Sequence, residues 1–254
     1  MFSVAADLST VPPFGVAGSA VVLVTAGYLM ALAPLGRRRF RRLRAARRTD
    51  PGALVAFYRR NVTGTMGLLL PVAVVLLVVP GLQPAQLGLA WPHGPSAGRA
   101  LDLFVGLVAS VLFTGMWRRR MARRGQPVPR PRRLETLLPA THAEYRWACA
   151  VSISAGICEE VVFRGLLVMA GIAAGWPPII AALAAGALFG GTHLYQGRLG
   201  MLLTTALGLA LTWFFVATGS LLFPIVLHIL IDLRGLVMVP AVTTSAEPVQ
   251  RSTA

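Results

Sequence analysis

The amino-acid sequence predicts an all-α fold, a polytopic transmembrane helix bundle of about seven spans. Hydrophobic residues make up 56% of its 254 residues, and only 13% are charged. Soluble domains carry roughly 25% charged residues, so this composition indicates a protein embedded in a bilayer. The sequence contains seven long apolar runs, each close to the length that a hydrocarbon core of about 30 Å requires. A count of six or eight spans would also fit this pattern.

Three apolar runs lie in the first half of the chain, at Val16–Leu35, Val62–Leu82 and Ala100–Trp117. The first and third are followed by arginine runs, Arg37–Arg48 and Arg118–Arg133, which hold sixteen of the 24 basic residues. Cytoplasmic loops beside membrane spans are enriched in Lys and Arg. We therefore expect both arginine runs in the cytoplasm and the N-terminus outside.

The two arginine runs differ in their expected local structure. Phe40 and Leu43 interrupt the first run, which favours a short amphipathic helix lying on the membrane surface. Three prolines, at positions 127, 129 and 131, fall within the second run. Because proline lacks a backbone N–H and clashes with the preceding helical turn, the second run is predicted to be a loop.

Four further apolar runs follow an amphipathic approach segment at Leu134–Arg146. They are expected at Trp147–Ile172, Ile179–Leu194, Leu199–Thr218 and Leu221–Val239. The second of these is rich in Ala and Gly, and small residues let helices approach closely in lipid, so it is expected at the centre of the bundle. Alternation of the spans places the C-terminus inside.

The domain organisation predicted from these runs is one continuous bundle. Residues 1–133 form a three-span region with arginine-rich cytoplasmic loops, 134–240 form the core that carries the candidate chemistry, and 241–254 form a disordered tail. The formal net charge is +15, but arginine runs that adjoin apolar spans are typical topology determinants. The predicted partner is therefore the lipid bilayer, and nucleic acid is not expected to bind.

The most informative stretch of the sequence is Glu159-Glu160, followed by Arg164, within an apolar run. Charged side chains at the centre of a bilayer cost roughly 2.5–3.5 kcal/mol each, and they usually mark functional sites. Glu160 and Arg164 are four residues apart and share a helix face. We predict an ion pair between them, which leaves Glu159 free for chemistry. The alternative is that all three residues form a purely structural network.

Three more titratable residues lie in neighbouring apolar runs, namely His193, His228 and Asp232. His228 and Asp232 are four residues apart and would share a helix face. Because polar groups are so rare at this depth, we expect Glu159, His193, His228 and Asp232 to line one pocket. A carboxylate and histidines in such a pocket can deprotonate a water molecule and stabilise the resulting charge.

Two hydrolytic mechanisms fit these residue types. In one, Glu159 and His193 activate a water that attacks a peptide carbonyl, and His228 with Asp232 stabilises the oxyanion. In the other, Glu159, His193 and His228 bind zinc, which acidifies the water. The sequence contains no HExxH motif of a zincin helix.

The motifs Glu159-Glu160-x-x-x-Arg164, Phe189-x-x-x-His193 and His228-x-x-x-Asp232 resemble the signature of the CAAX protease and bacteriocin-processing (CPBP) family. These proteins are intramembrane endopeptidases related to the type II CAAX prenyl protease. The resemblance covers about Leu134 to Leu236. It implies that Glu159 and His193 activate water, that His228 and residue 232 serve the oxyanion, and that the site opens toward the cytoplasmic leaflet.

The resemblance implies a supporting role for Glu160, Arg164 and Phe189. It leaves the cofactor open, since such proteins are often described as metalloproteases. We favour a mechanism without a cofactor and keep zinc as the alternative. The prenyl protease has Asn where this sequence has Asp232. An ionised Asp cannot donate a hydrogen bond to an oxyanion, so Asp232 is expected either to be protonated or to orient His228.

The expected function is hydrolysis of a peptide bond in a membrane-anchored or membrane-proximal peptide or protein. The Lys-free composition, rich in Arg and Ala, favours a bacterial cytoplasmic membrane. The alternatives are a non-catalytic scaffold or immunity-type protein of the same fold, and a proton-coupled transporter, in which buried Glu and His act as relays. Paired broken helices or recognisable repeats would favour a transporter, and the sequence shows neither.

Overall fold

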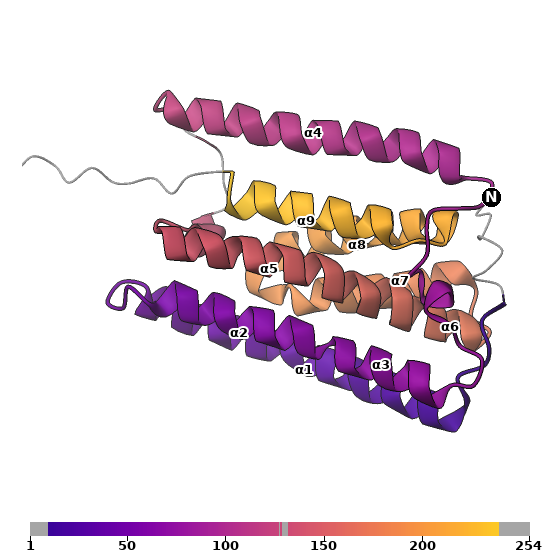
Figure 1. Ribbon diagram of the computed structural model, residues 1–254. Helices are drawn as coiled ribbons and strands as arrows, with labels where there is room; N and C mark the ends of the chain where they lie inside the picture. The colour runs from indigo at the N-terminus through magenta and orange to yellow at the C-terminus, as the bar shows by residue number, and fades with distance from the viewer. Residues whose placement is uncertain (1–9, 127, 129–131, 239–254) are drawn as a thin grey trace, which may run out of the picture.

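A computed structural model describes residues 10–126, 128 and 132–238, and this part of the chain contains helices and no strand. The helices are grouped into seven rods that lie roughly side by side in an elongated bundle (Figure 1). This architecture confirms the predicted all-α bundle of about seven spans. The tail predicted at 241–254 lies outside the described residues.

The rods are continuous helices or helices joined end to end. In chain order they are α1 (Gly15–Ala46), α2 (Ala53–Gly67) with α3 (Leu69–Val78), α4 (Ala97–Arg123), α5 (His142–Glu160) with the π-helical segment η4 (Val161–Val168) and α6 (Met169–Ala173), α7 (Pro178–Thr192), α8 (Arg198–Thr218) and α9 (Leu222–Leu236). Short 3-10 turns occur at η2 (Pro84–Leu87), η3 (Arg132–Leu137) and η5 (Leu194–Gln196).

Four helical stretches of the described chain are long and apolar enough to cross a membrane: Gly15–Ala46, Ala53–Val78, Ala97–Arg123 and Arg198–Thr218. Pro178–Thr192 is a shorter apolar helix. Many large apolar side chains on these helices are exposed, for example Leu23 and Leu77. Water would penalise such a surface whereas lipid would not, and the chain is accordingly an integral membrane protein.

The first arginine run does not form the separate surface helix that was expected. Instead α1 continues through it to Ala46. Phe40 and Leu43 are each 4% exposed and pack against Leu54 and Tyr58 of α2. The apolar residues that interrupt the arginine run therefore fill the interface between α1 and α2, and the arginines occupy the other faces of the same helix.

The second arginine run was predicted to be a loop, and this prediction is wrong for its first part. Helix α4 continues to Arg123 and ends before Gly125, whose positive φ of 69° stops the helical path. No proline lies between Ala97 and Arg123, so nothing interrupts the helix. The C-terminal ends of α1 and α4 lie at the same end of the bundle (Figure 1), so the two arginine runs are on one side of it.

The second rod begins earlier than predicted, at Ala53, and ends at Val78. It is interrupted at Leu68, between α2 and α3. Pro71 lies in the first turn of α3, and proline clashes with the carbonyl of the preceding helical turn, which explains the interruption. Arg59 and Arg60 consequently lie inside α2.

Helix α5, which carries the Glu159-Glu160 pair, is anchored at its start to the first two rods. The Thr141 side chain accepts a hydrogen bond from the Glu144 amide, and the Glu144 side chain accepts from the Thr141 amide, which is a capping box. Arg47 donates to both carboxylate oxygens of Glu144 and to the Leu138 carbonyl oxygen. The Tyr58 hydroxyl donates to the Leu137 carbonyl oxygen.

Immediately after Glu160, α5 passes into the π-helical segment η4. Seven of the eight residues of η4 are buried, among them Phe163 and Gly165. A Cβ atom at Gly165 would lie 2.8 Å from the Leu87 carbonyl oxygen, so only glycine allows η2 to approach here. The largest core cluster joins this segment to both halves of the chain, with Leu29 and Val75 on one side and Phe189 and Phe215 on the other.

The Arg47–Glu144 pair makes stability depend on pH. Glu144 lies ahead of the apolar part of α5 and is 3% exposed. Burial by itself raises the pKa of Glu144, but hydrogen bonds from Arg47 and from the amides of Ala140 and Thr141 outweigh it, so the pKa lies below its ordinary value of 4.5. A lowered folded-state pKa means that the pair stabilises the fold above about pH 4.5, and that this contribution is lost as the pH falls further.

We predict that Glu144→Gln lowers the free energy of unfolding at pH 7 by about 1.5–3 kcal/mol, because a hydrogen-bonded charged partner is removed. The difference between the variant and the wild type should shrink below about pH 4.5. Thermal unfolding of the purified protein between pH 7 and pH 3 measures both effects. Glu135→Gln, at an exposed position, is the matched control. A constant difference across this pH range would contradict the prediction.

Candidate active site

The predicted ion pair between Glu160 and Arg164 is formed in the interior of the bundle. Arg164 Nη1 donates to Glu160 Oε1 at 2.8 Å, and the two residues are 1% and 0% exposed. Arg164 Nη2 donates to the Gly208 carbonyl oxygen of α8 at 3.0 Å. The guanidinium carbon lies 4.6 Å from the centre of the Phe189 ring, a cation–π contact. One arginine therefore ties η4 to α5, α7 and α8.

His228 of α9 is held by the same carboxylate. Its Nδ1 lies 2.7 Å from Glu160 Oε1, the oxygen that also accepts from Arg164. An ionised carboxylate only accepts hydrogen bonds, so Nδ1 carries a proton and donates it. This contact determines the orientation of the imidazole and leaves Nε2 as the nitrogen available for chemistry.

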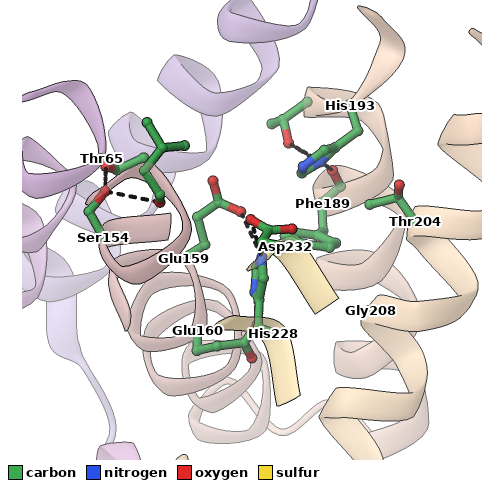
Figure 2. A network of polar contacts seen from close by, with 12 residues as sticks. Thr65, Ser154, Glu159, Glu160, Phe189, His193, Thr204, Gly208, His228 and Asp232 are labelled. Carbon is green, nitrogen blue, oxygen red and sulfur yellow. Dashed lines mark hydrogen bonds and ion pairs between the residues drawn. The ribbon is translucent and has the colours of Figure 1, made fainter. Parts of the chain in front are cut away.

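The Nε2 atom of His228 faces two further carboxylates. Glu159 Oε2 lies 4.0 Å from it and Asp232 Oδ2 lies 3.9 Å from it. Figure 2 shows Glu159, Asp232 and His228 converging on one point from α5 and α9. The side chains of Glu159 and Asp232 are 17% and 33% exposed, and Glu159 Oε2 has no hydrogen-bond partner within the described chain.

His193 follows the last residue of α7. Its Nδ1 lies 2.9 Å from the Phe189 carbonyl oxygen and 3.2 Å from Thr192 Oγ1. Because a carbonyl oxygen only accepts, Nδ1 carries the proton, and the Nε2 lone pair of the neutral ring is available to accept another. No hydrogen bond or ion pair joins His193 directly to the Glu159–His228–Asp232 group in the described part of the chain.

One cavity of about 420 Å³ brings all four predicted residues together. Glu159, His193, His228 and Asp232 all line it, together with residues of α1, α2 and η5. Its wall is mainly apolar with a smaller number of polar groups, which is typical of a ligand-binding pocket. The cavity also borders Tyr58 and Tyr195.

The proposed zinc ligands, Glu159, His193 and His228, do not form a metal site in this arrangement. Among the described residues, no group of three or more His, Cys, Asp or Glu side chains is placed to hold one metal ion. We therefore derive no reaction step through a metal ion.

Several features of the site were not predicted from the sequence. The second contact of Glu160, to His228, spans 68 residues, and no spacing rule could have revealed it. The Gly208 carbonyl was not recognised as an acceptor for Arg164. Glycine at this position leaves room for the guanidinium group, since an added Cβ atom would lie only 3.1 Å from Arg164 Nη2. The contribution of α1 and α2 to the cavity wall was also missed, because these helices carry no motif.

The fold and this cluster of residues define an integral membrane protein with a buried carboxylate–histidine site inside a helical bundle. Residues 142–234 match the model of the family described as type II CAAX prenyl endopeptidase Rce1-like. This match confirms the resemblance inferred from the three motifs, and all seven candidate site residues lie inside it. The family is one of membrane peptidases. No curated protein and no solved structure matches the chain.

The position of Arg164 leads to a prediction about stability. Arg164→Met should lower the free energy of unfolding by about 3–5 kcal/mol, because it leaves the Glu160 carboxylate buried without its cation. Adding Glu160→Gln to this variant should restore part of the loss, since the unpaired charge is then absent. Denaturation in mixed micelles measures both variants, with Arg38→Gln at an exposed position as control. A loss below about 1 kcal/mol for Arg164→Met would contradict the prediction.

Proposed function

We propose that the protein is an intramembrane endopeptidase that hydrolyses a peptide bond in a membrane-anchored or membrane-proximal substrate. The observation that carries this proposal is the group formed by Glu159, His228 and Asp232, with His193 on the same cavity. A carboxylate oxygen without a hydrogen-bond partner, next to an imidazole of determined orientation, is an arrangement suited to water activation. The peptidase family matched by residues 142–234 supports the same reaction.

In the proposed mechanism, Glu159 and His193 position a water molecule in the cavity. Glu159 takes one proton from the water as the oxygen attacks the carbonyl carbon of the substrate. The resulting tetrahedral intermediate carries its negative charge on the former carbonyl oxygen. The proton on Glu159 then passes to the leaving amine nitrogen as the C–N bond breaks. The products are a carboxylic acid and an amine, and Glu159 returns to its starting state.

His228 is proposed to stabilise the oxyanion through Nε2. This role requires a protonated ring, in which both nitrogens donate. Three carboxylates lie around the ring, at 2.7 Å from Nδ1 and at 4.0 and 3.9 Å from Nε2, and their negative charge stabilises such a cation. Asp232 then acts by orienting and charging His228, which suits a carboxylate better than direct donation to the oxyanion does.

The site is proposed to face the cytoplasmic leaflet of a bacterial cytoplasmic membrane, with the N-terminus outside and the C-terminus inside. The C-terminal ends of α1 and α4, which carry arginine runs, lie at the same end of the bundle (Figure 1). The positive-inside rule assigns that end to the cytoplasm. Arg39 and Arg60 line the same cavity as the candidate catalytic residues, so the cavity extends toward the arginine-rich end.

Glu159→Gln tests the catalytic proposal against a scaffold role. Gln preserves the size of the side chain but cannot accept the proton, so cleavage should fall by about 10²–10⁴-fold. Membranes from cells that express the wild type, the variant or the exposed control Glu135→Gln are compared by labelling new N-termini and identifying them by mass spectrometry. New N-termini should depend on the wild type and the control and disappear with Glu159→Gln. A phenotype retained in full by Glu159→Gln would favour the scaffold.

Asp232→Asn tests how the oxyanion is stabilised. Asn keeps a hydrogen-bonding side chain at this position, so the variant should retain substantial activity. The loss should stay within about tenfold of the wild type, because it removes one partly exposed charge interaction of about 1 kcal/mol. The rate of cleavage of an identified substrate measures the effect, with exposed Asp102→Asn as control. Loss of a bound metal in the Asp232→Asn protein, measured by elemental analysis, would instead support the zinc mechanism.

A further inference from the structure

The cavity that holds the candidate catalytic residues also has a basic part. Arg39 of α1 and Arg60 of α2 both line it. The same two arginines line a second cavity of about 190 Å³, which they share with Phe57, Asn61 and Arg42. Arg39 and Arg60 therefore border both cavities.

These two guanidinium groups differ from the arginines with structural partners. Arg47 is paired with Glu144, Arg164 with Glu160, and Arg234 donates to Thr114 Oγ1 at 2.9 Å. Arg39 and Arg60 are exposed, and neither forms an ion pair with an acidic residue among those that the structure describes. Asp50 borders the second cavity, where its Oδ1 accepts a hydrogen bond from the Gly52 amide.

Three contacts give the separation between the basic part of the cavity and the catalytic group. Going along α2, Tyr58 contacts Leu137, Thr65 contacts Ser154, and Met66 contacts Cys158. The residue numbers of both partners rise from one contact to the next, so α2 and α5 run in the same direction, as Figure 1 also shows. From these contacts, a helical rise of about 1.5 Å per residue places Arg60 roughly 10–15 Å from Glu159 along the bundle axis.

The charge of the cavity therefore changes sign along its length. Arg234, which donates to Thr114, is a third arginine on the wall of this cavity. Glu159 and Asp232 lie at the catalytic part, where they would repel an anionic group of a bound peptide. Arg39 and Arg60 lie toward the arginine-rich end, where they would attract it. A peptide with one carboxylate would consequently be oriented with that carboxylate at the arginines and a neutral peptide bond at His228. An extended chain covers roughly 10–15 Å in three to five residues.

We propose that Arg39 and Arg60 determine substrate specificity by binding a carboxylate of the substrate about three to five residues from the cleaved bond. The carboxylate belongs to an acidic side chain of the substrate. This inference rests on the proposed peptidase function. It assigns substrate selection to α1 and α2, which lie outside the segment matched by the peptidase family.

Binding to an inactive enzyme tests the inference apart from catalysis. The full-length Glu159→Gln protein in phosphatidylcholine nanodiscs is titrated with fluorescein-labelled apolar peptides. These carry either one Glu or one Gln, at each position in turn, and an amidated C-terminus. The Glu peptide should bind about tenfold more tightly than its Gln counterpart, which corresponds to about 1.4 kcal/mol.

Replacing either arginine should remove this discrimination. In Arg39→Gln and Arg60→Gln backgrounds, the ratio of the two Kd values should fall to near one. Arg60→Glu should reverse the preference toward a Lys-containing peptide. Arg41→Gln is the matched control, because Arg41 is an exposed member of the same run that borders neither cavity. The discrimination should also weaken as salt is added, since exposed charges are screened.

The outcomes separate this inference from the peptidase proposal. Equal discrimination in the Arg60→Gln and Arg41→Gln backgrounds would overturn the specificity role, even if the wild type cleaves peptides. Arginine replacements that change only the binding of phosphatidylglycerol, and not of the acidic peptide, would also overturn it and indicate lipid contacts. Discrimination in binding without any cleavage by the wild type would leave the specificity role standing and refute the peptidase proposal.

Discussion

The structure depends on one buried oxygen atom, Oε1 of Glu160. It accepts hydrogen bonds from both the Arg164 guanidinium and the His228 imidazole. A charge in this environment is tolerated only when it is paired and hydrogen-bonded. The pairing with Arg164 permits the carboxylate to be buried, and the carboxylate in turn orients His228. The stability of the bundle and the geometry of the candidate site therefore both depend on the contacts of this one atom.

The surroundings of this atom explain why the neighbouring groups have such different environments. Arg164 continues to the Gly208 carbonyl and the Phe189 ring, so its positive charge is enclosed by the protein. Glu159, the adjacent residue in the chain, points instead into the cavity, where its Oε2 lacks a hydrogen-bond partner within the described residues. Two consecutive glutamates thus have different environments, one paired in the interior and one facing the cavity, because successive helical residues point about 100° apart. The transition to a π-helix directly after Glu160 adds a further change in direction.

The first two rods are part of the site although they carry no catalytic motif. They close one wall of the cavity, and the contacts of Arg47 and Tyr58 with the segment before α5 hold them in register. A change in the position of α1 or α2 would therefore change the shape of the cavity without touching His228 or Glu159. The candidate catalytic residues lie within residues 142–234, whereas the shape and the charge of the cavity also depend on the N-terminal half.

The sequence by itself determined the fold class, the approximate spans, the Glu160–Arg164 pair and the four candidate catalytic residues that line the cavity. These features follow from local rules: apolar length, the helical repeat, and the cost of charges in lipid, which makes rare polar residues informative. Helix ends were predicted less well, because Phe40 and Leu43 are buried against α2 and because α4 continues to Arg123 and ends only before Gly125. Only the tertiary structure decided that Glu160 holds His228 and that Arg39 and Arg60 border the same cavity. Those contacts join residues far apart in the chain, and their existence depends on how the helices pack.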